Sequence, residues 1–221
     1  MNILVTGGAG YIGSHMVYAL LDKGFNVHVI DNLSTGNQSV LPSNIIFTKC
    51  DIENSKIISK LIKKNNFSAV IHFAGSVSVL ESVENPIKYF NNNVSKTITF
   101  INCCLENNLK KFLFSSTAAV YGDSKNNLIS ESYAKDPVNP YGFTKLMVEN
   151  VLQNISAAHN LNYGILRYFN VSGADPTMRT GQMSKKATHL IKIACETALG
   201  NRSYMKIYGN DYNTIDQVNL I

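Results

Sequence analysis

A short strand-like run followed by closely spaced glycines constrains the fold of this chain more than any other feature. Ile3–Val5 is apolar, glycines follow with the spacing GxxGxxG, and apolar residues recur at helical spacing over Tyr11–Lys23. Strand, glycine turn and helix in this order predict a pyrophosphate site at the helix N-terminus, where backbone N–H groups are unpaired. We expect Gly7 to permit the turn, Gly10 to admit the phosphates and Gly13 to bring the helix close to the strand. A loop that merely needs positive φ is the alternative.

A second predicted strand, Asn26–Ile30, ends at Asp31, which lies at the position where an acidic residue contacts a ribose. A carboxylate there accepts hydrogen bonds from both ribose hydroxyls and repels a 2′-phosphate, so the sequence favours NAD over NADP. An aspartate that only caps a turn is the alternative. Asn92 and Asn93 carry amides that reach the cofactor or face solvent. The other residues expected around NAD lie in the first helical turn or at strand ends: Tyr11, Ile12, Asn32, Leu33, Ser34, Thr35, Gly36, Asp51, Ile52, Phe73, Ala74 and Gly75.

Predicted strands and helices alternate along the chain. Further strands are expected over residues 45–48, 69–73, 111–115 and 163–168, and helices over 55–64, 86–107 and 140–159. This alternation, without hairpin signals, predicts an α/β fold with a doubly wound parallel sheet and helices on both faces. We expect a Rossmann-like NAD-binding domain over residues 1–170 and an incomplete substrate-binding lobe over 171–221. Ligands of such sheets bind beyond the carboxyl ends of the strands.

A tyrosine and a lysine four residues apart carry the predicted chemistry. Tyr141 and Lys145 share one face of the helix expected after residue 140. A nearby ammonium and the positive nicotinamide ring would stabilise the phenolate and lower the pKa of Tyr141. Tyr141 would then take a proton from a substrate hydroxyl, Lys145 would bind the nicotinamide ribose, and the Thr117 hydroxyl would bridge substrate and Tyr141. An ordinary Tyr/Lys pair on a helix surface is the alternative.

Several segments together resemble the extended short-chain dehydrogenase/reductases, and among them the UDP-glucose 4-epimerase branch. These segments are VTGGAGYIGSH, IDNLSTG, VIHFAG, ESVENP, YFNNNVSKT, FLFSSTAAVYG, PYGFTKLMVE, LRYFNVSGADP and IYGNDY. They cover nearly the whole chain and follow the order of that family.

The resemblance implies interconversion of UDP-galactose and UDP-glucose by reversible hydride transfer at sugar C4 to tightly bound NAD, with Tyr141 as the base. It also implies that Phe169 lies beside the nicotinamide and that Asn170 touches the phosphates of the sugar nucleotide. Thr188, His189 and Leu190 match the segment that lines the uridine pocket. Ser76 and Val77 match positions that contact NAD, although many members of the family have a lysine where Val77 stands.

The chain departs from the family pattern towards its end. Lys192 stands where the family has a proline, and the chain stops at Ile221 while the family continues through a further substrate-binding segment. We therefore expect a C-terminally truncated member with exposed apolar residues such as Leu199 and Ile207.

Two other functions remain open at this point. A nucleotide-sugar 4,6-dehydratase would need acids after the threonine, but Ala118 and Ala119 follow Thr117. A non-catalytic NAD-binding remnant would explain the early end, while the nearly intact cofactor and catalytic motifs oppose it.

Composition excludes several other classes. The net charge of +5 is spread over scattered basic residues, which argues against nucleic acid as a partner. Four cysteines without a CxxC pair suggest a reducing compartment, and five dispersed histidines predict no metal site.

The absence of a signal peptide and of an apolar run of membrane-spanning length predicts a cytoplasmic protein without membrane contact. A homodimer formed through the helices over residues 86–107 and 140–159 is a family expectation.

Overall fold

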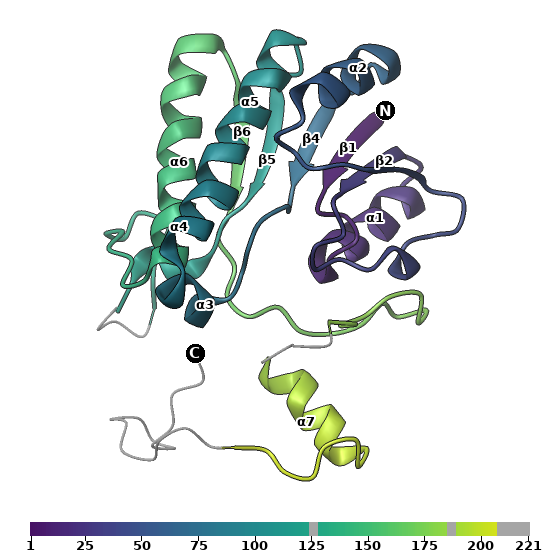
Figure 1. Ribbon diagram of the computed structural model, residues 1–221, viewed down its shortest axis with the longest axis vertical. Coiled ribbons are helices and arrows are strands. Elements are labelled where there is room, and N and C mark those ends of the chain that lie inside the picture. The colour runs from purple at the N-terminus through teal and green to yellow at the C-terminus, as the bar shows by residue number, and fades with distance from the viewer. Residues whose placement is uncertain (124–127, 185–188, 207–221) are drawn as a thin grey trace.

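The computed structural model describes residues 1–123, 128–184 and 189–206, and its centre is a parallel sheet of six strands (Figure 1). All pairings are parallel, and the strand order is β3-β2-β1-β4-β5-β6. The sheet confirms the predicted doubly wound fold. The strands are β1 (Asn2–Thr6), β2 (Asn26–Asp31), β3 (Ile46–Lys49), β4 (Ala69–His72), β5 (Lys111–Ser115) and β6 (Asn162–Leu166).

Helices cover both faces of the sheet. On one face α2 (Ser55–Asn65), α5 (Lys96–Glu106) and α6 (Pro140–His159) pack on an apolar cluster that includes Phe112 and Phe114. On the other face α1 (Tyr11–Asp22) packs over β1 and β2. The remaining elements are α3 (Val79–Glu84), α4 (Pro86–Tyr89), α7 (Leu190–Ala198), the 3-10 turns η1 (Gln38–Val40) and η3 (Ala118–Tyr121), and the π-helical turn η2 (Phe90–Ser95).

The strand order reverses between β1 and β4, and this reversal opens a crevice at the carboxyl ends of the strands. Chain segments leave β1 and β4 towards opposite sides at such a point, which is where doubly wound sheets bind their ligands. The turn after β1 and the loop after β4 both lie at this edge of the sheet. The fold therefore brings the glycine turn and the loop after β4, which carry several of the predicted cofactor residues, next to each other.

One predicted helix has a more complicated form than the sequence pattern indicates. The helix expected over residues 86–107 is built of α4, the π-helical turn η2 and α5 in direct succession. The three adjacent asparagines Asn91–Asn93 lie inside η2. Such π-turns are rare and occur often at functional sites. Hydrophobic periodicity does not reveal the extra residue in a turn, so the sequence predicted one continuous helix. The short helix α3 was not predicted either.

The segment after β6 packs less closely than the rest. Helix α7 buries none of its residues, and it lies apart from the sheet and its covering helices in Figure 1. Leu199, just after α7, is 75% exposed, as the sequence predicted, while Ile207 lies outside the described residues. No helix among the described residues is long and apolar enough to cross a membrane.

A shallow hollow of about 320 Å³ lies over the strands β1, β4, β5 and β6. Its lining includes Ile3, Ile71 and Leu113, which belong to the same face as α1. Parallel sheets normally have both faces covered. In the described part of the chain, α1 covers only the β1–β2 half of this face.

His72, the last residue of β4, is a buried and uncharged histidine. Its Nδ1 lies 2.7 Å from Thr6 Oγ1 and its Nε2 lies 3.2 Å from Thr97 Oγ1. Its ring stacks on Phe100 with the ring centroids 5.4 Å apart. Burial, helped by the charge of Lys145, lowers the pKa of His72 to about 3.

This lowered pKa predicts a pH dependence of stability. The unfolded chain binds a proton at this histidine near pH 6.5, whereas the folded protein does not bind it until about pH 3, so protonation favours unfolding between these values. The stabilising contribution is present above pH 6.5 and is lost as the pH falls. In urea unfolding from pH 6 to pH 4, His72→Gln should reduce the slope of the unfolding free energy by about 1.4 kcal/mol per pH unit. Equal slopes for both proteins would contradict the assignment.

Candidate active site

The glycine turn packs against the end of β4 without room for side chains. Gly7 has a φ of +69°, and a Cβ built on it would lie 2.5 Å from the backbone nitrogen of Ala74. A Cβ on Gly13 would lie 2.2 Å from the carbonyl oxygen of Gly7. The tight turn expected at Gly7 and the close helix approach expected at Gly13 are both present. Larger residues at these two positions would push α1 away from the sheet.

The N-terminus of α1 suits an anionic group. Gly10 is the N-cap, no side chain caps the helix, and its first turn carries no acidic residue. The positive end of the helix dipole therefore has no acidic residue in its own first turn and can attract an anionic group. This is the environment that a diphosphate requires.

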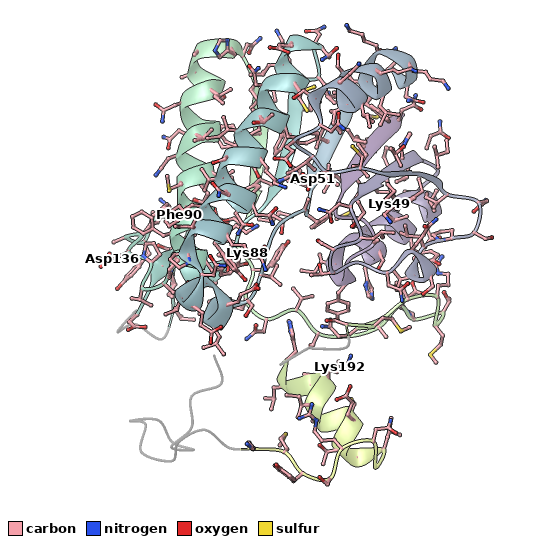
Figure 2. The ribbon with its side chains drawn as sticks, viewed as in Figure 1. Lys49, Asp51, Lys88, Phe90, Asp136 and Lys192 are labelled. Carbon is pink, nitrogen blue, oxygen red and sulfur yellow. The ribbon has the colours of Figure 1, made fainter. Side chains whose placement is uncertain are left out.

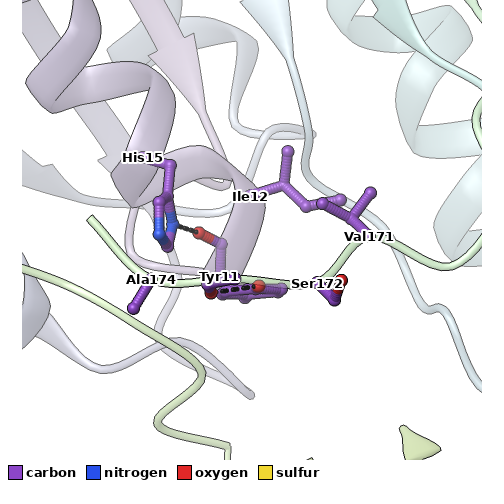
Figure 3. A pocket seen from close by; sticks show the side chains of 7 residues that line it. Tyr11, Ile12, His15, Val171, Ser172 and Ala174 are labelled. Atoms are coloured by element: carbon purple, nitrogen blue, oxygen red, sulfur yellow. Dashed lines mark hydrogen bonds between the residues drawn. The ribbon is translucent and has the colours of Figure 1, made fainter. Parts of the chain in front are cut away.

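A pocket of about 160 Å³ adjoins this helix end (Figure 3). It lies between Tyr11 and His15 of α1 and the segment 171–174 that follows β6. The hydroxyl of Tyr11 donates a hydrogen bond of 2.6 Å to the carbonyl oxygen of Gly173. The predicted cofactor residue Tyr11 thus links α1 to the segment after β6.

The carboxylate of Asp31 is held at the end of β2 beside the glycine turn. It accepts hydrogen bonds of 3.0 Å from the backbone of Ala9 and 2.8 Å from the backbone of Leu33. Burial raises the pKa of Asp31, and these two hydrogen bonds oppose the increase. A Cβ on Gly36 would come within 3.1 Å of both carboxylate oxygens, so the loop 32–36 folds close over Asp31. Each oxygen keeps lone pairs for further donors, so the residue fits a ribose as well as the turn that it caps.

Asp51, labelled in Figure 2, has partners within the protein. Its side chain accepts hydrogen bonds of 2.9 Å from both Lys96 Nζ and Asn32 Nδ2. Burial raises the pKa of Asp51, but these bonds outweigh it and the pKa lies below its usual value. The residue therefore joins the segment after β3 to α5. Ile52, expected with it around NAD, is buried in the core.

Two adjacent asparagines of η2 hold the loop after β4. Asn93 accepts a hydrogen bond from the backbone N–H of Ser76 at 2.8 Å and donates one to the carbonyl oxygen of Ser76 at 3.0 Å. Asn92 donates to the Ser76 hydroxyl at 2.9 Å. The sequence left these amides to the cofactor or to solvent, whereas the structure gives them a role in fixing the loop. Val77, the next residue, is 66% exposed.

Tyr141, Lys145 and Thr117 come together where β5 meets the N-terminal half of α6. The Lys145 ammonium lies 5.9 Å from the centre of the Tyr141 ring and donates to the carbonyl oxygen of Ser115 at 2.9 Å. The Thr117 side chain lies close enough to the Tyr141 hydroxyl to act against the rise in its pKa. A Cβ on Gly75 would lie 3.6 Å from Lys145 Nζ, so this cluster adjoins the loop after β4. The structure thus assembles Tyr141 and Lys145, predicted from the YxxxK spacing, with Thr117, predicted at the end of the strand.

Without a bound cofactor, the pKa of Tyr141 is raised. The sequence predicts that Lys145 and the nicotinamide ring together lower this pKa; in the protein alone burial raises it, and the neighbouring Thr117 side chain offsets this only in part. Burial also lowers the pKa of Lys145 to about 8, because its ammonium is enclosed and pairs with no carboxylate among the described residues. Proximity of charges can be deduced from helical spacing, whereas desolvation depends on tertiary packing. The phenol therefore keeps its proton at neutral pH unless a bound molecule adds positive charge.

A buried charge network lies beside this cluster and was not predicted. Glu149 is 3% exposed and accepts hydrogen bonds from Arg167 and from the Ser116 hydroxyl. The available signal was the spacing, because Glu149 follows Lys145 by one helical turn on the same face as Tyr141. The sequence of a helix does not distinguish a buried acidic residue from one that is exposed to solvent.

Three of the predicted site residues after β6 are exposed. Phe169, expected beside the nicotinamide, is 69% exposed, and the predicted substrate residues Asn170 and Leu190 are exposed too. His189 is the N-cap residue of α7 but does not cap it with its side chain. Thr188 lies outside the described residues. The catalytic cluster is thus assembled in this structure, whereas these substrate residues are not gathered around it.

Fold and site together define a dinucleotide-binding protein of the doubly wound class, with a tyrosine–lysine pair beside the dinucleotide crevice. The model of the NAD dependent epimerase/dehydratase family matches residues 3–214. This chain therefore belongs to that family.

Within this family, the chain is similar to several UDP-glucose 4-epimerases. The chain is 47% identical over 215 residues to a UDP-glucose 4-epimerase of Azospirillum brasilense and covers 62% of it, and it is 45% identical to one of Halalkalibacterium halodurans and covers 64%. These alignments include 97% and 98% of this chain. A crystal structure of the Brucella ovis UDP-glucose 4-epimerase in complex with NAD has a TM-score of 0.93 at 42% identity. The alignment covers 97% of this chain and 66% of the Brucella ovis chain. The chain thus spans less than two thirds of the length of these relatives.

Replacing Gly13 tests the close packing of the turn. A methyl group there would collide with the backbone oxygen of Gly7, so Gly13→Ala should destabilise the protein by about 1–3 kcal/mol in urea unfolding. Helix propensity alone favours alanine by up to about 1 kcal/mol, so a net loss identifies the collision.

The matched control is Gly181→Ala. Its added Cβ would meet its nearest neighbour at 3.6 Å, an ordinary contact, and its stability should change little. Equal stability changes in the two variants would show that the turn has room for a side chain.

Proposed function

We propose that this protein is an NAD-dependent isomerase that interconverts UDP-galactose and UDP-glucose, a UDP-glucose 4-epimerase. The observation that carries the proposal is the Tyr141, Lys145 and Thr117 cluster at the carboxyl edge of a dinucleotide-binding sheet. Relatives with 40–47% identity that bear this name support it. The UDP-glucose 4-epimerase of Bifidobacterium longum was solved with NAD+ and UDP, which supports both cofactor and substrate class.

The residues around the glycine turn fit NAD. The uncapped N-terminus of α1 would hold its diphosphate, Asp31 its adenosine ribose, and Lys145 its nicotinamide ribose. Bound NAD supplies the reversible acceptance of a hydride from the sugar C4. It would also add a positive charge to that of the Lys145 ammonium, which favours the Tyr141 phenolate.

In the proposed mechanism Tyr141 removes the proton of the sugar 4-hydroxyl while the hydride leaves C4. Thr117, which lies close to the Tyr141 hydroxyl, would orient the reacting oxygen. Lys145 would stabilise the phenolate and keep one donor on the Ser115 carbonyl, which fixes its position. After the 4-keto sugar has turned over, the hydride would return to the other face of C4 while Tyr141 gives the proton back to the oxygen, so the product differs only in its configuration at C4.

Two accompanying proposals concern assembly and location. Apolar side chains are exposed on α3 to α6, which pack together, and they support a homodimer formed through these helices: Leu80, Val83, Ile87, Ile98 and Phe143. A single-chain mass by light scattering would refute the dimer.

The described cysteines are all free, which supports a cytoplasmic location. Fractionation that placed the protein outside the cytoplasm would refute that location.

A non-catalytic NAD-binding protein is the second candidate. The exposure of Asn170 and Leu190 favours it, because a substrate pocket needs such residues turned inward. Both candidates predict NAD binding, and they differ in turnover.

Tyr141→Phe separates the two candidates. The purified 221-residue protein should convert UDP-galactose to UDP-glucose, and removal of the phenolic hydroxyl should lower kcat by about 100-fold or more. NAD should stay bound, measured by calorimetry because the chain has no tryptophan for fluorescence. Tyr163→Phe, at the opposite end of the sheet, is the matched control. NAD binding without turnover in the wild type would overturn the epimerase proposal in favour of the second candidate.

Asp31→Ala tests the placement of the ribose. Loss of a charged hydrogen-bond acceptor should weaken NAD binding by about 10- to 100-fold. The preference for NAD over NADP should shrink as well, since the carboxylate no longer repels a 2′-phosphate. An unchanged ratio of the two affinities would place the adenosine ribose elsewhere.

A further inference from the structure

We propose that the buried ion pair between Glu149 and Arg167 positions the end of β5 for proton transfer at Tyr141. Its link to the strand end is the Ser116 hydroxyl, and the residue held in place is Thr117. Neither Glu149 nor Arg167 contacts the reacting atoms, so both are positioning residues. The inference rests on the proposed function.

The pair has the geometry of a rigid clamp. Arg167 Nε donates to the two carboxylate oxygens of Glu149 at 2.9 and 3.1 Å, and Nη2 donates to Oε2 at 2.7 Å. Such a bidentate contact fixes orientation as well as distance. The Glu149 side chain is 4% exposed and the Arg167 side chain 16%.

The end of β5 is held by the ion pair and by the strand segment that carries Arg167. The Ser116 hydroxyl donates to Glu149 Oε1 at 2.5 Å, and the Ser116 N–H donates to the carbonyl oxygen of Leu166 at 2.9 Å. One residue beyond Thr117, the N–H of Ala118 donates to the carbonyl oxygen of Tyr168 at 3.1 Å. Thr117 therefore sits between two anchored neighbours.

Arg167 also reaches the turn that follows Thr117. Its Nη1 donates to the Tyr121 hydroxyl at 2.8 Å, and its guanidinium carbon lies 5.3 Å from the centre of the Tyr121 ring. Tyr121 is the last residue of η3, which begins directly after Thr117. The pair thus connects α6, β6 and both flanks of Thr117.

Stability alone is a poor explanation for this arrangement. Burying two charges costs about as much as their attraction returns, and apolar replacements of such pairs are often neutral or stabilising. What an apolar pair cannot provide is a directional acceptor for Ser116. The geometry therefore points to a role in alignment. The pair would hold Thr117, which follows β5, in a fixed position relative to Tyr141 on α6.

The alignment has a chemical consequence. Burial raises the pKa of Tyr141, and the neighbouring Thr117 side chain opposes that increase. A displaced Thr117 would weaken this effect. Tyr141 would then be a poorer base and would be misaligned with the sugar hydroxyl.

Ser116→Ala tests the link with little risk to folding, because it removes one hydrogen bond and leaves the ion pair intact. We expect kcat to fall by about 10- to 100-fold with KM nearly unchanged. We also expect a higher pKa for Tyr141 in an NMR titration of the tyrosine Cζ resonance, assigned with Tyr141→Phe. Ser59→Ala is the matched control, since its hydroxyl donates at 2.9 Å to Asn107 between α2 and α5, away from the cluster.

A double variant, Glu149→Leu with Arg167→Met, removes the clamp without leaving an unpaired buried charge. A folded double variant with reduced kcat and retained NAD affinity supports a positioning role. Wild-type kcat in the folded double variant or in Ser116→Ala, with an unchanged Tyr141 titration, overturns it. A wild-type protein without turnover refutes the proposed function instead, and the Tyr141 titration, which needs no turnover, then decides on the positioning role by itself.

Discussion

Contact between two backbones, the glycine turn and the end of β4, is the constraint on which the candidate site depends. The space at Gly7 is closed by Ala74, and the space at Gly13 is closed by Gly7 itself. This contact sets how far α1 stands from the loop after β4. Because that loop continues through Gly75 to the neighbourhood of Lys145, one short segment joins the proposed cofactor site to the proposed catalytic cluster.

Electrostatics in the cluster follow from burial more than from neighbouring charges. Lys145 has a lowered pKa and Tyr141 a raised one, because each is enclosed where its charged form is poorly solvated. Both shifts favour the neutral forms in the protein alone. A positively charged cofactor would change this balance, so binding and activation of the base are linked in the proposed enzyme.

Local sequence patterns predicted most of the fold and the central residues of the site. The helix expected over residues 140–159 has those bounds in α6, and the alternation of strands and helices gave the parallel sheet. The role of Glu149 could not be predicted, because it depends on Arg167 and Ser116, which only tertiary structure brings to it. The π-helical turn escaped detection because one extra residue per turn barely alters an apolar periodicity.

That π-helical turn also limits how this segment can change in length. Asn92 and Asn93 are consecutive, yet both reach Ser76, which the wider turn allows. Deleting one residue between 90 and 95 would let the segment relax into a regular α-helix, but it would rotate everything before the deletion by about 100° relative to α5. Ser76 would then face a different set of side chains. The helix between β4 and β5 is therefore fixed in residue number, whereas an ordinary amphipathic helix is constrained mainly in its apolar face.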